Sequence, residues 1–213
     1  MAWPPIPDEK PGLLPQREVR GRTLRSSFDP AVCLEFSDRY SYAGGQRFVL
    51  YDVADAEQHF FVDAGPDHIL RSFYWIQFEA YLPEKGGTYP YASIHPIRIG
   101  SLDFITDTKV LADYGKTVMN PDSLNGSDQS RAGVLLRAKG YRLPAAAVRA
   151  RMFYLPDESR RKELMIIYVE SLAPSDSPRD LPVESSADEK FAELARRATE
   201  DAANGLRIGS LCK

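Results

Sequence analysis

The sequence predicts a mainly β protein of the α+β class. We expect roughly seven or eight strands in an antiparallel sheet that is wrapped towards a barrel, with an amphipathic helix at the C-terminal end. Apolar and aromatic runs follow one another without alternating helices, and the gaps between them are short and turn-like. Only the last periodic segment has clear helical spacing. Strands in series argue against a parallel sheet of βαβ units.

Two hairpins and one long strand make up the first half of the predicted sheet. Ala31–Tyr40 and Gln46–Ala54 flank a turn at residues 41–45 that contains two glycines. A second turn, at residues 55–58, leads into His59–Ala64. Ile69–Leu82 alternates polar and apolar residues with a period of two, which is typical of a strand.

The second half adds an interrupted strand, one uncertain segment and the clearest hairpin. Pro96 interrupts a strand over residues 93–108 and indicates an edge or a bulge. Ser127 is placed to cap a short helix that stops at Gly140, but residues 133–143 also read as a strand. Two apolar, β-branched runs separated by a polar turn predict a hairpin, Val148–Leu155 with Glu163–Leu172.

Composition divides the chain into four parts. Residues 1–27 form an arm rich in proline and arginine, residues 28–172 a single β-rich domain, and residues 173–185 a linker with three prolines. Residues 186–213 hold the C-terminal helix and tail, where Ser186 and Glu189 form a capping-box pattern. A single amphipathic helix cannot stand alone, so we expect it to pack on the domain or on another subunit.

Charge, cysteine content and apolar runs narrow the classes of function. The 213 residues carry a net charge of −3, which does not favour nucleic acid or an anionic membrane surface as partners. The longest apolar run has only six residues, too few to span a membrane, and the N-terminus lacks the pattern of a signal peptide. Because two cysteines are too few for a secreted disulfide framework, we predict a cytoplasmic location.

Recognisable catalytic and cofactor motifs are missing from the sequence. It contains no P-loop, no dinucleotide-binding glycine pattern, no zinc-protease motif and no serine-hydrolase elbow. The three histidines, His59, His68 and His95, lack the spacing that would bring two metal ligands together. We therefore predict no cofactor and no metal.

Polar residues inside otherwise apolar strands are the most informative feature for function. If the sheet wraps around a cavity, a lining that mixes aromatic side chains with a few ionisable groups is typical of a ligand site. The candidate ligand-binding residues are Phe73, Trp75, Gln77, Glu79, Arg151 and Tyr168. In the alternative interpretation, this strand face points to water, and the C-terminal helix covers its aromatic residues.

Three functions fit this pattern. The first is binding of a small, partly apolar molecule in the cavity. The second is an enzyme of the isomerase or cyclase type on the same scaffold, with Glu79 or Glu170 as the acid–base group. The third is an interaction module, in which the arm, its arginine stretch and the C-terminal helix contact a protein partner or a second copy of the chain, giving a homo-oligomer.

Overall fold

The computed structural model describes residues 13–91, 96–117, 126–172 and 189–209, and it is built on two antiparallel sheets. In spatial order, the strands of the larger sheet are β4 (Ser41–Leu50), β5 (Ala54–Ala64), β6 (Leu70–Tyr81), β10 (Lys162–Ser171), β9 (Ala147–Tyr154), β8 (Leu102–Leu111) and β7 (Pro96–Ile99). The smaller sheet consists of β1 (Glu18–Arg20), β2 (Thr23–Ser26), β3 (Val32–Phe36) and β11 (Leu206–Gly209). The helices are α1 (Tyr114–Thr117), α2 (Asp128–Ala138) and α3 (Glu189–Asn204).

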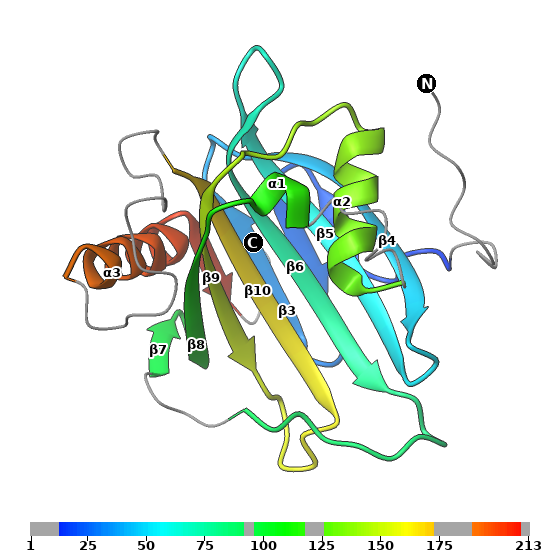
Figure 1. The fold of residues 1–213 in the computed structure, drawn as a ribbon. Helices are drawn as coiled ribbons and strands as arrows, with labels where there is room; N and C mark the ends of the chain where they lie inside the picture. Colours follow the sequence, from blue (N-terminus) through cyan, green and yellow to red (C-terminus); the bar gives the residue numbers. More distant parts are fainter. Residues whose placement is uncertain (1–12, 92–95, 118–125, 173–188, 210–213) are drawn as a thin grey trace.

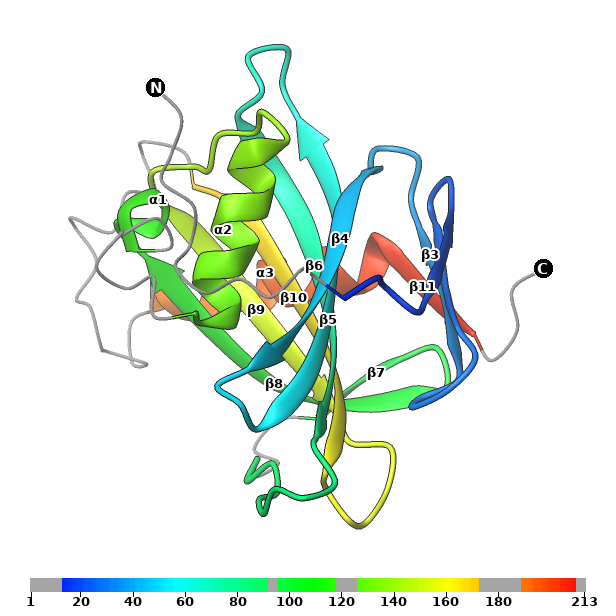
Figure 2. The same ribbon diagram turned by 90° about the vertical axis from the view of Figure 1, so that its right-hand side faces the viewer.

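Both faces of the larger sheet are covered, by different elements. Figures 1 and 2 show α1 and α2 on one side of this sheet and the smaller sheet on the other. We call the side under α1 and α2 the helix face and the opposite side the inner face. Helix α3 contacts β8, β9, β10 and β11 on the inner face. This arrangement makes the larger sheet the middle layer, so its central strands are buried on both sides.

The inner face carries an aromatic core shared by the two sheets. Phe36 of the smaller sheet stacks on Phe61 of β5, with 3.8 Å between ring centroids. The hydroxyl of Tyr74 on β6 donates a hydrogen bond of 2.8 Å to the carbonyl of Ala202, which fixes the end of α3. The same cluster extends across β10 and β9 through residues such as Ile166.

The mainly β class, the antiparallel pairing and the C-terminal helix are confirmed. The predicted strand Ile69–Leu82 is β6, and the predicted hairpin after Val148 is formed by β9 and β10. Ser127 caps α2 by accepting a 3.1 Å hydrogen bond from the backbone N–H of Ser130, so the helix is correct and the alternative strand at residues 133–143 is wrong.

The predicted closure towards a barrel is not confirmed. Within the described part of the chain, β4 and β7 are edge strands with one neighbour each, and neither sheet closes on itself. The larger sheet instead hides its two faces beneath separate layers, so closure is not needed to bury its apolar side chains. Pro96 opens β7, in keeping with its expected place at an edge.

Two predicted turns in the first half are wrong. Residues 41–45 belong to β4. The strand has a bulge between Tyr42 and Gly44, and Gly44 has a φ of +141°. Residues 55–58 belong to β5. The chain turns instead between these two strands, where Tyr51 and Asp52 both have positive φ.

Other predictions fall at the ends of the chain. Part of the predicted arm, residues 18–26, forms β1 and β2, and part of the predicted tail forms β11 against β3. The proline-rich start, the linker at 173–185 and the Ser186 cap lie outside the described residues. The division into four parts therefore stays a prediction. Among the described helices, none is long and apolar enough to cross a membrane.

A buried carboxylate fastens the N-terminal segment to the larger sheet. Glu57 of β5, 1% exposed, accepts hydrogen bonds from the backbone N–H groups of Gln16 and Arg17 at 3.0 and 2.9 Å. It also pairs with the Arg17 guanidinium at 3.0 Å and with His59 Nε2 at 2.8 Å. Burial alone would raise the pKa of Glu57, but these partners outweigh it and lower the pKa to about 2.

We expect Glu57→Gln to destabilise the fold by about 3–5 kcal/mol at pH 7, because it leaves the buried Arg17 charge without a counter-ion. A carboxyl whose pKa falls on folding stabilises the fold above its unfolded pKa. The wild type should therefore lose this contribution as the pH falls from about 4.5 towards 2, and the variant should not. Urea unfolding at pH 7 and pH 3 measures both effects, with the exposed Glu35→Gln on β3 as the control.

Candidate functional site

Central strand β6 supplies most of the side chains of the candidate site. Phe73, Trp75, Gln77 and Glu79 alternate onto its helix face, with Trp75 and Gln77 only 3% and 0% exposed. Arg151 of β9 lies opposite Ile167 of β10, which in turn lies opposite Trp75, so all three share this face. Five of the six predicted ligand-binding residues are therefore on one face, although their role in binding stays a prediction.

The alternative interpretation of this face is wrong. It does not point to water, because Phe73, Trp75 and Gln77 are buried. Nor does the C-terminal helix cover its aromatic residues. They pack in one cluster with Tyr114 of α1 and Leu136 of α2.

Two predicted residues point to the opposite side. Tyr168 pairs with Tyr74 across β10 and β6 and so belongs to the inner face, where the two rings are 5.1 Å apart. Glu170 shares that face and accepts a 3.2 Å hydrogen bond from the Tyr168 hydroxyl. Burial raises the pKa of Glu170, but no candidate ligand-binding residue of the helix face lies on its side of the sheet.

A chain of amide hydrogen bonds crosses three strands and ends at Glu79. Gln46 Nε2 donates to Gln58 Oε1 at 2.7 Å, and Gln58 Nε2 donates to Gln77 Oε1 at 2.8 Å. Gln77 Nε2 then donates to Glu79 Oε2 at 2.7 Å, while the Tyr89 hydroxyl donates to Glu79 Oε1 at 2.8 Å. Both oxygens of Glu79 are thus held by directed donors.

A second carboxyl group, which the sequence did not single out, lies beside Glu79. Glu163 of β10 is the direct cross-strand neighbour of Glu79, and Asp128 opens helix α2 above them, 3.5 Å from Gln77 Nε2. We call Glu79, Glu163 and Asp128 the carboxyl cluster. Burial raises the pKa of all three groups, and repulsion by Glu79 adds to the effect on Glu163, whose pKa rises to about 8.

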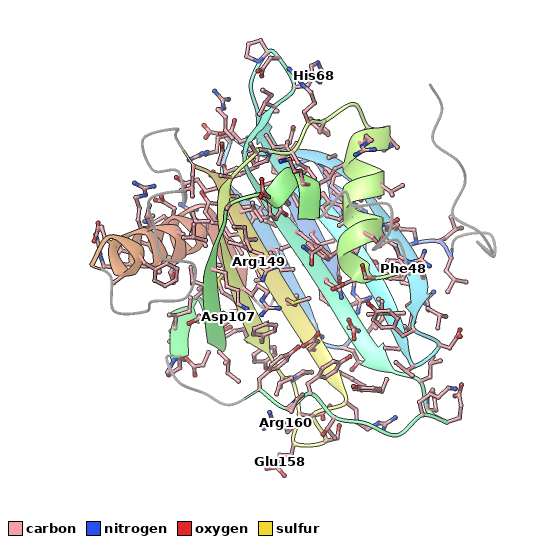
Figure 3. All side chains as sticks on the ribbon, in the orientation of Figure 1. Phe48, His68, Asp107, Arg149, Glu158 and Arg160 are labelled. Carbon is pink, nitrogen blue, oxygen red and sulfur yellow. The ribbon has the colours of Figure 1, made fainter. Side chains whose placement is uncertain are left out.

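Three buried polar atoms on the helix face have no hydrogen-bond partner. They are Trp75 Nε1 on β6, Glu163 Oε2 on β10 and Arg149 Nε on β9, which are neighbouring strands. Because nearly all buried polar atoms in folded proteins find partners, three exceptions on one face call for an explanation. In Figure 3, which views this face, Arg149 lies over the middle of the sheet.

The charges near Arg149 are unevenly matched. Arg151 is paired with Asp107 of β8, to which its Nε donates at 3.1 Å, and Figure 3 shows Asp107 towards the β8 side. None of the ion pairs among the described residues includes Arg149. Burial lowers the pKa of Arg149, and the neighbouring Arg151 lowers it further.

A small pocket on the inner-face side is a weaker candidate. It has a volume of about 120 Å³, well below the ~300–1,000 Å³ of typical ligand sites. Most of its charged residues already have partners. Arg17 pairs with Glu57 inside the pocket, while Asp55 pairs with Arg47 at 2.6 Å and Asp29 pairs with Lys162 at 3.0 Å. Such a pocket has little polar capacity left for a ligand.

Comparison with known proteins gives no match to a family model, to a curated protein or to a solved structure. The function must therefore be inferred from the geometry of the site.

Sequence reasoning missed the residues whose place depends on pairing. Glu163 stands at the start of an apolar strand, where a charge is usually solvated, and Asp128 looks like an ordinary first-turn residue of a helix. The available signal was that Glu163, Met165 and Ile167 are spaced two residues apart, which places them on the same face of the strand. It becomes informative only once β10 is known to pair with β6.

Glu163 should make the stability of the fold depend on pH. Its pKa rises from about 4.5 in the unfolded chain to about 8 in the fold, so the folded state keeps a proton that the unfolded state has lost. Stability should therefore fall as the pH rises from about 4.5 to about 8. Glu163→Gln removes this effect, so we expect the variant to be more stable than wild type by about 2–4 kcal/mol at pH 9 and close to it at pH 4.5.

Denaturant unfolding over this pH range measures the effect. The matched control is Glu158→Gln, an exposed position in the β9–β10 turn that is labelled at the tip of this turn in Figure 3. Parallel stability curves for wild type and Glu163→Gln would show that Glu163 is charged throughout, contrary to the expectation.

Proposed function

We propose that this chain binds a small, partly apolar molecule on the helix face of the larger sheet, next to the carboxyl cluster. The observation that carries the proposal is the set of three buried, unpartnered polar atoms on Trp75, Glu163 and Arg149. Each such atom costs about 1–3 kcal/mol while it lacks a partner. A ligand that supplies the missing partners would recover part of this free energy on binding.

The surroundings of these atoms support the same proposal. Aromatic rings lie beside the polar groups, including Tyr91, which stacks on Phe153 with 4.0 Å between centroids. Apolar side chains of β10, among them Met165 and Ile167, separate the carboxyl cluster from Arg149. Apolar walls with a few converging polar groups are typical of small-molecule sites.

Acid–base catalysis is the second candidate, and one observation favours it. A carboxyl group with a pKa of about 8 can hold a proton at neutral pH and release it to a substrate, as a general acid must. The predicted group Glu79 lies in this site, held by Gln77 and Tyr89, whereas Glu170 does not. Under this proposal, Glu163 is the proton donor and Glu79 is the neighbouring carboxyl group that helps to raise its pKa.

The proposed partner is thus a small molecule, and the predictions on other partners stay open. A role as an interaction module and a homo-oligomeric state stay predictions, as does the lack of nucleic-acid and membrane partners. A cytoplasmic location also stays a prediction.

Native mass spectrometry of protein purified from its own host tests the proposed binding. We expect extra mass that disappears on denaturation, and this mass identifies the class of the ligand. If the protein has no extra mass, and if a broad set of small metabolites also fails to shift its unfolding temperature, the binding proposal is wrong. The same spectrum reports the number of subunits.

Trp75→Phe is the matching variant, because it removes the unpartnered Nε1 atom and keeps an aromatic ring in the buried cluster. We expect the ligand found by mass spectrometry to bind about tenfold more weakly, the loss of one hydrogen bond to a buried donor. Trp75→Ala is less useful, since removing this buried ring should cost about 3–5 kcal/mol of stability. Tyr154→Phe, on the inner face of β9, is the control. Equal affinity in wild type and Trp75→Phe would show that Nε1 does not contribute to ligand binding.

A further inference from the structure

A chain of hydrogen bonds on the inner face joins a partly exposed tyrosine to a buried carboxylate. The Tyr42 hydroxyl of β4 lies 3.0 Å from His59 Nδ1, and His59 Nε2 lies 2.8 Å from Glu57 Oε1. His59 and Glu57 of β5 are each 1% exposed, whereas Tyr42 is 36% exposed. The chain therefore runs from the molecular surface into the interior, and neither of the functions considered above uses it.

The charge of Glu57 sets the direction of each hydrogen bond in this chain. Glu57 is ionised, because the backbone N–H groups of Gln16 and Arg17 and the Arg17 guanidinium all donate to it. A carboxylate can only accept, so a neutral His59 carries its proton on Nε2 and leaves a lone pair on Nδ1. The Tyr42 hydroxyl then donates to Nδ1. This is the arrangement of a nucleophile, its general base and the group that orients the base.

The local structure of β4 brings the Tyr42 hydroxyl to His59. The strand is bulged between Tyr42 and Gly44, and bulges are a common means of re-aiming a side chain next to an active site. Gly45 lies opposite His59, and a Cβ atom at this position would come within 2.7 Å of both the Tyr42 hydroxyl and His59 Nδ1. Only glycine therefore leaves room for this hydrogen bond. Glu57 fastens the N-terminal segment without any of these features.

The surroundings of the Tyr42 hydroxyl suit attack on a carbonyl group. Burial, together with the charge of Glu57, raises the pKa of Tyr42 to about 12, so the hydroxyl is protonated at neutral pH and needs His59 to accept its proton. Beyond Leu13, which bridges Arg47, no described strand pairs with the outer edge of β4. Alternate backbone N–H groups along that edge thus lack a strand partner and can donate to the carbonyl oxygen of a substrate.

We propose that Tyr42 and His59 are catalytic residues that hydrolyse a carboxylic ester, with Glu57 as the positioning residue for His59. Tyr42 Oη forms a bond to the acyl carbon while its proton passes to His59 Nδ1, and the alcohol takes this proton as its own bond to the acyl carbon breaks. Water then attacks the acyl-tyrosine, and His59 transfers a proton from this water to Tyr42 Oη as the carboxylic acid is released. This activity is independent of the ligand binding proposed for the helix face.

A covalent probe tests the nucleophile in the wild-type protein. An aryl sulfonyl fluoride forms a sulfonate ester with a reactive tyrosine and releases fluoride, and mass spectrometry of peptides after brief labelling at neutral pH locates the ester. We expect Tyr42 to be labelled before Tyr51, although Tyr51 is 56% exposed and easier to reach. If Tyr51 or another exposed tyrosine is labelled first, Tyr42 is not activated and the proposal is overturned.

Histidine variants test the base. His59→Asn should slow the labelling of Tyr42 by about 100-fold, a typical contribution of a general base, and leave that of Tyr51 unchanged. The matched control is His68→Asn, the same substitution at an exposed turn position labelled in Figure 3, which should be labelled as the wild type is. Equal rates at Tyr42 in wild type and His59→Asn would overturn the role of His59. If His59→Asn does not fold, the wild-type comparison of the two tyrosines decides the question.

The same readout tests the positioning residue. Glu57→Gln, measured under conditions in which it is folded, should slow the labelling of Tyr42 but not that of Tyr51. A loss of stability alone would not produce this difference within one molecule. If both tyrosines keep their wild-type rates, Glu57 does not orient His59.

Hydrolysis of p-nitrophenyl acetate tests the complete reaction. We expect a burst of about one p-nitrophenolate per chain followed by slower steady release, with an acetyl group on Tyr42 when the reaction is stopped with acid. Tyr42→Phe should abolish both phases, and the exposed Tyr51→Phe should change neither. A burst that does not require Tyr42, or acetylation without steady release, would overturn the hydrolytic activity and leave the ligand binding of the helix face unaffected.

Discussion

The pairing of β6 with β10 is the constraint on which both faces of the larger sheet depend. Nine residue pairs join these strands, from Lys162 opposite Ala80 to Glu170 opposite Ser72, and both strands are buried along most of their length. Because successive side chains alternate between faces, a slip of one residue would exchange every buried side chain of β10 between the faces. The same register that closes the aromatic core also sets Glu163 beside Glu79. The fold and the candidate site are therefore fixed by one pairing.

Two buried glutamates on opposite faces of this sheet show how the surroundings decide which form of a carboxyl group is favoured. Glu57 is held by two backbone N–H groups, a guanidinium and an imidazole, so its charged form is favoured. Glu163 is as deeply buried but lacks a partner at Oε2, and its neutral form is favoured. A partly satisfied buried network is costly for stability, and such costs tend to be retained where they serve function.

How much the sequence reveals depends on whether the signal is local. The alternation in Ile69–Leu82, the β9–β10 hairpin and the Ser127 cap are contained within short segments and were predicted correctly. The open sheet, the β11 strand and the face of Tyr168 depend on contacts between distant segments, which alternation alone cannot assign. The four candidate residues on β6 share one face because alternation within a single strand places them there. Glu163 was missed because its place beside Glu79 depends on the pairing of two strands.

The two faces of β6 differ in how their polar side chains are paired. On the inner face, the hydroxyls of Tyr40 and Tyr74 have partners in Ser72 and Ala202, and the buried Glu57 is paired with Arg17. The helix face has a hydrophobic cluster of its own, and beside it Trp75, Glu163 and Arg149 each keep one buried polar atom without a partner. Because the aromatic core lies on the other side of the same strands, the sheet can tolerate this loss without losing its register. An alternation of apolar with polar residues along β6, which usually separates core from solvent, here separates two buried faces of the same strand.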